Sequence, residues 1–111
     1  MQFRQGDVLL ERVDAVPANA MPKRPPAGRP LLVAPGRGGT RSHVLAPGSD
    51  VAAWSLAAVP DGTPDYLVVG LHGARLVHEE HAPIDLPQGT YRVVRQREFD
   101  PGLAAVRPVL D

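Results

Sequence analysis

The chain has 111 residues, of which 12 are basic, 12 are acidic, 13 are proline and 11 are glycine, and it contains no cysteine. This length fits a single domain (1–111), and the prolines and glycines exclude a helical bundle, because proline breaks a helix interior and glycine weakens it. The balanced charge gives no overall attraction for nucleic acid, and the lack of cysteine excludes disulfides and thiolate metal ligands.

The N-terminal segment, Met-Gln-Phe-Arg-Gln-Gly-Asp, lacks the apolar core of a signal peptide. No run of the chain approaches the roughly 20 apolar residues of a membrane span, so we expect a cytoplasmic protein without a membrane partner. Gln5-Gly6-Asp7 is a turn signal, and the apolar run at 8–13 after it predicts a strand. We interpret Asp7 as a turn residue rather than a catalytic one.

Residues 14–30 form a proline-rich segment with five prolines, Pro17, Pro22, Pro25, Pro26 and Pro30. These prolines argue against a regular ladder or helix, because each lacks an amide donor and restrains the residue before it. The segment therefore predicts a surface loop, to which Lys23, Arg24 and Arg29 add positive charge. Such a loop is also a candidate binding segment for a protein partner.

Short apolar runs separated by turn signals fill the rest of the chain, and they predict strands at 31–34, 43–46, 51–59, 66–71, 75–78 and 90–99. The run at 66–71 is continuous and is expected to be buried on both faces. Trp54, the only tryptophan, is expected to fill the core. The tail at 100–111 is predicted to be a covering segment. The spacing is typical of an all-β domain, either a compact small β-barrel or a two-sheet sandwich.

The candidate site combines three histidines and two glutamates, His43, His78, His81, Glu79 and Glu80. Imidazole and carboxylate groups bind zinc, iron, manganese or nickel when thiolate is absent. The histidines at 78 and 81 face opposite sides of a regular strand, so they converge only where the backbone is irregular, as the nearby Pro83 indicates. We predict the three histidines as metal ligands, with Glu79 or Glu80 as a ligand or a catalytic base.

Two other interpretations of these residues stay open. The histidines and glutamates could form charge-assisted hydrogen bonds that fix loops without any metal. They could also perform metal-free acid–base catalysis. Arg41, in a glycine-rich segment, and Arg95 and Arg97, in the last predicted strand, are candidate ligand-binding residues. Salt bridges to the glutamates are the simpler explanation for the last two, and nucleic-acid binding is disfavoured.

Three segments carry a resemblance to other proteins: QGDVLL at 5–10, HEEHAPI at 78–84 and LPQGTYRVVRQRE at 86–98. Together they are similar to a family of small uncharacterised bacterial proteins, so the resemblance implies no particular activity. It does imply a Gly-His-x-His segment at the centre of the chain, where Thr40-Arg41-Ser42-His43 keeps one histidine. The likeness to cupins is architectural only, because their Gly-x5-His-x-His spacing is absent.

Two functions therefore follow from the sequence. One is a small cytoplasmic β-protein with a His/Glu polar site that binds a divalent metal. The other is a non-catalytic interaction or adaptor module, which uses the proline-rich loop or an open strand edge to contact a partner protein while the His/Glu cluster is structural.

Overall fold

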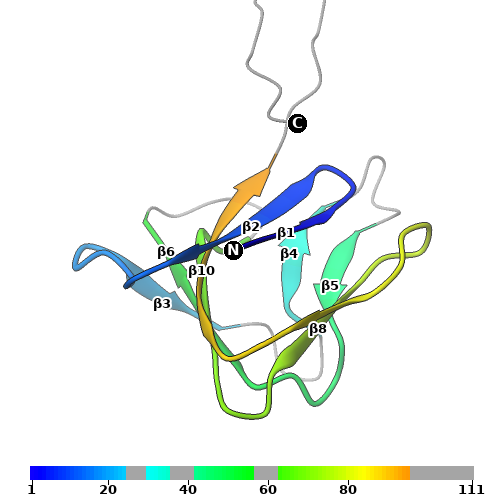
Figure 1. Cartoon of the computed structure of the whole chain (residues 1–111). Coiled ribbons are helices and arrows are strands. Elements are labelled where there is room, and N and C mark those ends of the chain that lie inside the picture. Colours follow the sequence, from blue (N-terminus) through cyan, green and yellow to red (C-terminus); the bar gives the residue numbers. More distant parts are fainter. Residues whose placement is uncertain (25–29, 36–41, 57–62, 96–111) are drawn as a thin grey trace, which may run out of the picture.

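The computed structural model describes residues 1–24, 30–35, 42–56 and 63–95, and these ranges contain ten strands and no helix (Figure 1). The strands are β1 (Gln2–Gln5), β2 (Val8–Val13), β3 (Met21–Lys23), β4 (Leu32–Ala34), β5 (His43–Leu45), β6 (Val51–Ser55), β7 (Tyr66–Val69), β8 (Ala74–Val77), β9 (Ile84–Leu86) and β10 (Gly89–Arg95). No helix in these ranges is long and apolar enough to cross a membrane.

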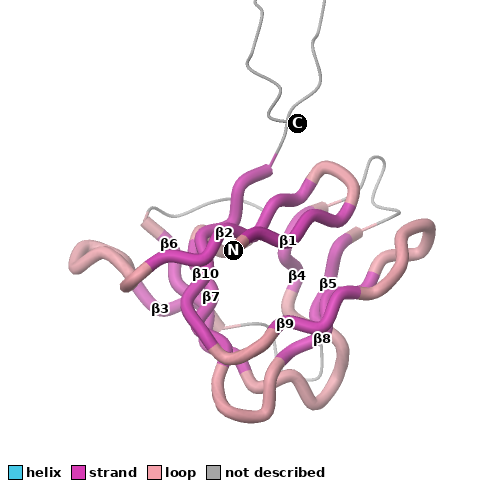
Figure 2. Tube along the Cα trace, viewed as in Figure 1, coloured by secondary structure: helices cyan, strands magenta, loops and turns pink. Residues whose placement is uncertain are grey.

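The strands form two antiparallel sheets that enclose a common interior (Figure 2). Sheet A has six strands in the order β1-β2-β10-β7-β6-β3, and sheet B has four in the order β4-β5-β8-β9. The all-β prediction and its two-sheet sandwich form are confirmed. The barrel alternative is wrong, because within the described ranges no strand pairing joins the edges of sheet A to those of sheet B.

The core lies between the sheets and follows the alternation of side chains along each strand. On β2, Val8 and Leu10 are 0% and 1% exposed, and on β10 Tyr91 and Val93 are 0% and 7% exposed. Tyr91 is the largest fully buried side chain, and its hydroxyl donates a hydrogen bond to the carbonyl oxygen of Pro87 at 2.7 Å. The paired strands β2 and β10 therefore form the apolar centre of sheet A.

A short strand lies inside the predicted proline-rich loop, contrary to expectation. β3 contains Pro22, which pairs with Trp54 of β6. Proline is tolerated there because β3 is an edge strand of sheet A, so one side of its backbone has no partner strand to which an amide would donate.

Two burial predictions for central residues are wrong. Trp54 is half-buried, because along β6 it alternates with Ala53 and Ser55, which face the core. The run at 66–71 is buried on one face only: Leu67 and Val69 are buried, while their neighbours on β7 are half-exposed. Sheet B covers one face of sheet A, so alternate side chains are left on the other face.

Several predictions lie outside the described residues. These are parts of the proline-rich segment (25–29), the glycine-rich segment (36–41), the ends of two predicted strands (57–59 and 96–99), and the tail (100–111). His72 and Gly73 lie in the segment that joins β7 to β8, and Pro87 and Gln88 join β9 to β10.

One row of residues across sheet A positions the site. Gln5 pairs with Val8, and Val8 pairs with Arg95, so the three side chains lie side by side on β1, β2 and β10. Val8 is fully buried, and the row faces sheet B. The two polar members of the row both reach backbone carbonyls beyond sheet A, as described below.

Candidate functional site

The turn between β1 and β2 brings the first polar residues to the site. Gln5 and Val8 are the last paired residues of this hairpin, so Gly6 and Asp7 form a two-residue turn. Gly6 has φ of +57°, in the left-handed region that glycine adopts without strain. The turn lies against the histidines: a β-carbon on Gly6 would be 2.6 Å from Nε2 of His81 and 3.4 Å from Cε1 of His43.

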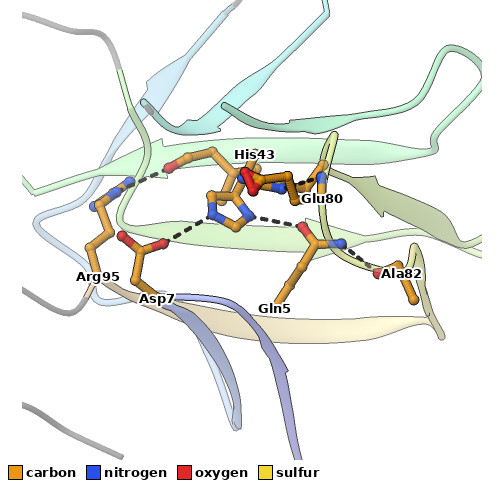
Figure 3. A network of polar contacts seen from close by, with 8 residues as sticks. Gln5, Asp7, His43, Glu80, Ala82 and Arg95 are labelled. Carbon is orange, nitrogen blue, oxygen red and sulfur yellow. Dashed lines mark hydrogen bonds and ion pairs between the residues drawn. The ribbon is translucent and has the colours of Figure 1, made fainter. Parts of the chain in front are cut away.

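Gln5 is fixed by three hydrogen bonds beneath this turn, and it is 3% exposed. Its Nε2 donates to the carbonyl oxygen of Leu76 at 3.0 Å and to that of Ala82 at 2.9 Å. Figure 3 shows the bond to Ala82. Both of these partners are acceptors, so the amide cannot rotate by 180° without losing both bonds. Its Oε1 therefore faces Nδ1 of His43, 2.8 Å away, and accepts the hydrogen that Nδ1 carries.

His43 is the buried centre of the site. It lies at the start of β5, is 2% exposed, and places Nε2 3.0 Å from Oδ1 of Asp7. Burial lowers the pKa of His43 below its usual value, and the neighbouring His78 lowers it further, whereas Asp7 raises it. The net effect favours the neutral imidazole. In the neutral ring Nδ1 keeps the hydrogen for Gln5, so Nε2 presents a lone pair to the side chain of Asp7.

In this tautomer, no proton lies between Nε2 of His43 and Oδ1 of Asp7. A lone pair on Nε2 and a carboxylate oxygen cannot form a hydrogen bond until a proton lies between them. The Asp7 side chain is 62% exposed, whereas that of His43 is 3% exposed, so the pair connects the interior to solvent.

The structure brings the three predicted histidines together. The ring centres of His43 and His78 are 4.3 Å apart, those of His78 and His81 are 4.6 Å apart, and those of His43 and His81 are 6.2 Å apart. His43 and His78 are neighbours because β5 and β8 pair with Val44 opposite Val77. His81 belongs to the loop between β8 and β9, where an irregular backbone was expected.

The metal hypothesis is not supported, although the histidines converge. Nδ1 of His78 accepts the backbone N–H of Glu80 at 3.0 Å, so in the neutral ring the hydrogen is on Nε2. Both ring nitrogens of His43 already face Gln5 and Asp7. Within the described ranges, no group of three or more histidine, aspartate and glutamate side chains could hold a metal ion. The described residues therefore do not provide the ligand set that zinc, iron, manganese or nickel would need.

The two predicted glutamates lie at the margin of this cluster. Glu79 and Glu80 are both exposed in the β8–β9 loop. Arg95 donates from Nε to the carbonyl oxygen of Val33 at 3.0 Å and from Nη2 to that of Pro64, and its Nη1 is 3.9 Å from Oδ1 of Asp65. Arg41 and Arg97 lie outside the described residues. The catalytic role of the glutamates and the ligand-binding role of the arginines stay predictions.

Sequence reasoning missed Gln5 and assigned Asp7 to the turn alone. A signal for Gln5 was available: it has the same parity as Phe3 on a strand, so the polar side chain had to face the interior beside an apolar one. A buried glutamine needs partners for both ends of its amide, which indicates a polar network. Gly6 carried no comparable signal, because its close approach to His81 depends on a loop 75 residues away.

One comparison with known proteins gives a match. Residues 4–96 match the family model described as "Domain of unknown function (DUF8820)". No curated protein and no solved structure matches the chain. The matched range contains the hairpin tip and all three histidines of the cluster.

Proposed function

This chain belongs to the DUF8820 family, and we propose that it performs metal-free proton transfer on a small substrate, with His43 as the general base and Asp7 as its partner. One observation carries the proposal: the amide of Gln5 holds the hydrogen of His43 on Nδ1, so the basic lone pair is on Nε2, beside Asp7. A base held in one tautomer by a buried amide is the arrangement that general base catalysis requires.

The proposed step needs only residues of the described site. Nε2 of His43 accepts a proton from a substrate hydroxyl group or from a bound water, and the ring becomes an imidazolium. The Asp7 carboxylate, 3.0 Å from Nε2, then stabilises the new charge, while Gln5 Oε1 keeps its bond to Nδ1. A positioned base of this kind contributes a rate enhancement of about 100-fold to 10,000-fold. In this proposal His43 is the general base, a role that the sequence analysis predicts for Glu79 or Glu80, and Asp7 is the carboxylate beside it.

Exposure decides where a substrate would enter. His43 is buried, His78 is half-buried, and His81 and Asp7 are exposed, so the cluster opens to solvent through the hairpin tip and the β8–β9 loop. Within the described residues, neither of the two cavities that contact β5 or β8 is lined by these side chains. A substrate would therefore contact the cluster at its rim, beside Asp7 and close to Nε2 of His43.

A non-catalytic function is favoured by a different observation. Gln5 and His43 are nearly fully buried, and together they tie the β1–β2 hairpin to sheet B. In this second candidate the cluster stabilises the fold, and the function lies on another surface of the domain. The two candidates differ in what Asp7 does, because an exposed carboxylate adds little to stability but is essential to the proposed proton transfer.

The test compares wild type, Asp7→Asn and, as a control for charge, Asp14→Asn. Each protein is incubated with a small-molecule extract, and consumption is followed by mass spectrometry. We expect a compound that wild type and Asp14→Asn consume and that Asp7→Asn leaves. In parallel, nitrogen NMR of the imidazoles should show His43 with hydrogen on Nδ1 at neutral pH. Hydrogen on Nε2 instead, or equal turnover by folded Asp7→Asn, would contradict the proposal.

A further inference from the structure

A cavity of about 470 Å³ lies away from the histidine cluster, at the β3 end of sheet A. Residues of β3 and β6 line one side, and the segments around β4 and β5 line the other; its lining includes Lys23, Arg24, Leu31, Leu45 and Ala53. The volume is within the range of small-molecule sites, about 300–1,000 Å³. It exists because sheet A has six strands and sheet B has four, so β6 and β3 extend beyond the smaller sheet.

The inner end of this cavity is apolar. Leu31, Leu45 and Ala53 are 8%, 2% and 5% exposed, and all three belong to the hydrophobic core. Three prolines, Pro22, Pro30 and Pro47, contribute to the remaining wall. A ligand that placed an apolar group there would be stabilised by the removal of apolar surface from water.

Two of the side chains that line the cavity, Lys23 and Arg24, carry a positive charge. Lys23 pairs with Ala53 across β3 and β6, and directly opposed residues of an antiparallel pair project from the same face. Lys23 therefore projects to the side of the buried Ala53, and it is half-buried, whereas Arg24 is exposed beside it. The lining includes no aspartate or glutamate, and within the described ranges neither cation forms an ion pair.

We propose that this cavity binds a small organic anion. The apolar body of the ligand packs on Leu31, Leu45 and Ala53, and its single anionic group, a carboxylate or a phosphate, contacts Lys23 and Arg24. An uncompensated cation over an apolar surface selects this class of ligand, because a neutral apolar molecule leaves the charge unpaired and a fully polar anion gains nothing from the inner wall. None of the histidine cluster lines the cavity, so this site does not depend on the function proposed above.

Lys23 provides a direct probe, because it is the only lysine in the chain. Reductive methylation with ¹³C-formaldehyde labels its amine and that of Met1, and it preserves both charges. The two labels are well separated, since β1 and β3 are the opposite edges of sheet A. Titration with 1-anilinonaphthalene-8-sulfonate should shift the Lys23 signal saturably and leave the Met1 signal in place. No shift at Lys23 at millimolar probe, or equal shifts at both amines, would overturn the proposal.

Matched compounds and variants test the two parts of the site. Neutral N-phenyl-1-naphthylamine should bind at least about fivefold more weakly than the sulfonate, because it lacks the anionic group. Lys23→Gln should weaken sulfonate binding by a similar factor, and Lys23→Arg should retain it. Arg4→Gln removes the same charge on β1 at the far edge of the sheet and should have no effect. Equal losses in Lys23→Gln and Arg4→Gln would show overall charge, rather than this cavity, to be responsible.

Competition identifies the anionic group. Decanoate and decyl phosphate share an apolar chain and differ in the head group, so the stronger competitor for the sulfonate indicates a carboxylate or a phosphate ligand. Decanol has the chain without the charge and should compete poorly. Competition by decanol as strong as that by the two anions would overturn the role of Lys23 and Arg24. Because Lys23 is on an edge strand, Lys23→Gln and Lys23→Arg leave the hydrophobic core unchanged.

Discussion

Gly6 and His81 are packed so closely that a β-carbon on Gly6 would lie 2.6 Å from Nε2 of His81. Gly6 also has φ of +57°, which costs a residue with a side chain about 1–2 kcal/mol. The turn and the imidazole cluster therefore depend on the same glycine. The cost of the positive φ and the effect of the close contact with His81 can be separated by experiment.

We expect Gly6→Ala to lose about 1 kcal/mol of unfolding free energy and to displace His81. Gly48→Ala is the control: Gly48 has φ of +85°, but a β-carbon there would have no atom within 4 Å. Urea unfolding should give similar losses for both variants. Imidazole NMR signals of His81 and His43 should move only in Gly6→Ala, and unchanged signals in that variant would contradict the close packing.

Gln5→Ala removes the amide that joins the hairpin tip to sheet B. The substitution leaves the carbonyls of Leu76 and Ala82 and Nδ1 of His43 without their partner. We therefore expect the free energy of unfolding to fall by about 3 kcal/mol. Gln88→Ala, at an exposed glutamine, should be close to neutral. Urea denaturation measures both. A loss for Gln5→Ala no larger than that of the control would show that water replaces the amide without cost.

The stability of the domain should depend on pH through His43. Its pKa is lowered in the folded state from the usual 6.5, so at pH values between the two the unfolded chain binds more protons. This contribution is complete above about pH 6.5 and is lost as the pH falls below that value towards the folded pKa. Urea unfolding at a series of pH values from neutral to mildly acidic should show the decline.

Asp7→Asn should make the loss of folding stability at acidic pH steeper. Asp7 is the group that raises the pKa of His43, so its neutral replacement lowers this pKa further. Asp14→Asn, at an exposed carboxylate near the end of β2, should follow the wild-type profile. A less steep decline in Asp7→Asn would mean that Asp7 does not hold the proton of the imidazolium.

Arg95→Ala should destabilise the domain by about 2 kcal/mol, because the guanidinium donates to the carbonyls of Val33 and Pro64. Arg95→Lys should recover only part of this loss, since an ammonium cannot reproduce the planar guanidinium fork. Arg92→Ala, on the same strand, removes a surface pair with Glu11 and should cost less than about 1 kcal/mol. Equal losses for the two alanine variants would contradict the structural role of Arg95.

Chelator should have no effect on the protein. Nδ1 of His43 and Nδ1 of His78 are engaged by protein groups, and the described residues include no group of three or more side chains that could hold a metal ion, so removal of divalent metal should leave the urea midpoint unchanged. Elemental mass spectrometry on protein purified without a histidine tag checks the same point. Stoichiometric zinc that is lost in His78→Ala would restore the metal hypothesis.

Local patterns predicted most of the strands, because side-chain alternation and turn residues are visible in a single chain. The same alternation misplaced Trp54, since it does not say which face of β6 the other sheet covers. β3 was missed because Pro22 is acceptable only at an edge, and the order of strands is a property of the whole fold. The histidine set was predicted from residue type, whereas its chemistry depends on the partners of each ring nitrogen. Those partners, Gln5 and Asp7, come from the far end of the chain.

The position of β10 between β2 and β7 has a consequence for biosynthesis. Sheet A contains the first two strands of the chain, yet within the described ranges they connect to the rest of the sheet only through β10, residues 89–95. On a translating ribosome the β1–β2 hairpin cannot pair with the rest of sheet A until β10 has emerged. Gln5 and Asp7 are at the tip of that hairpin, so the histidine cluster acquires its buried amide and its carboxylate only when synthesis of the described chain is nearly complete.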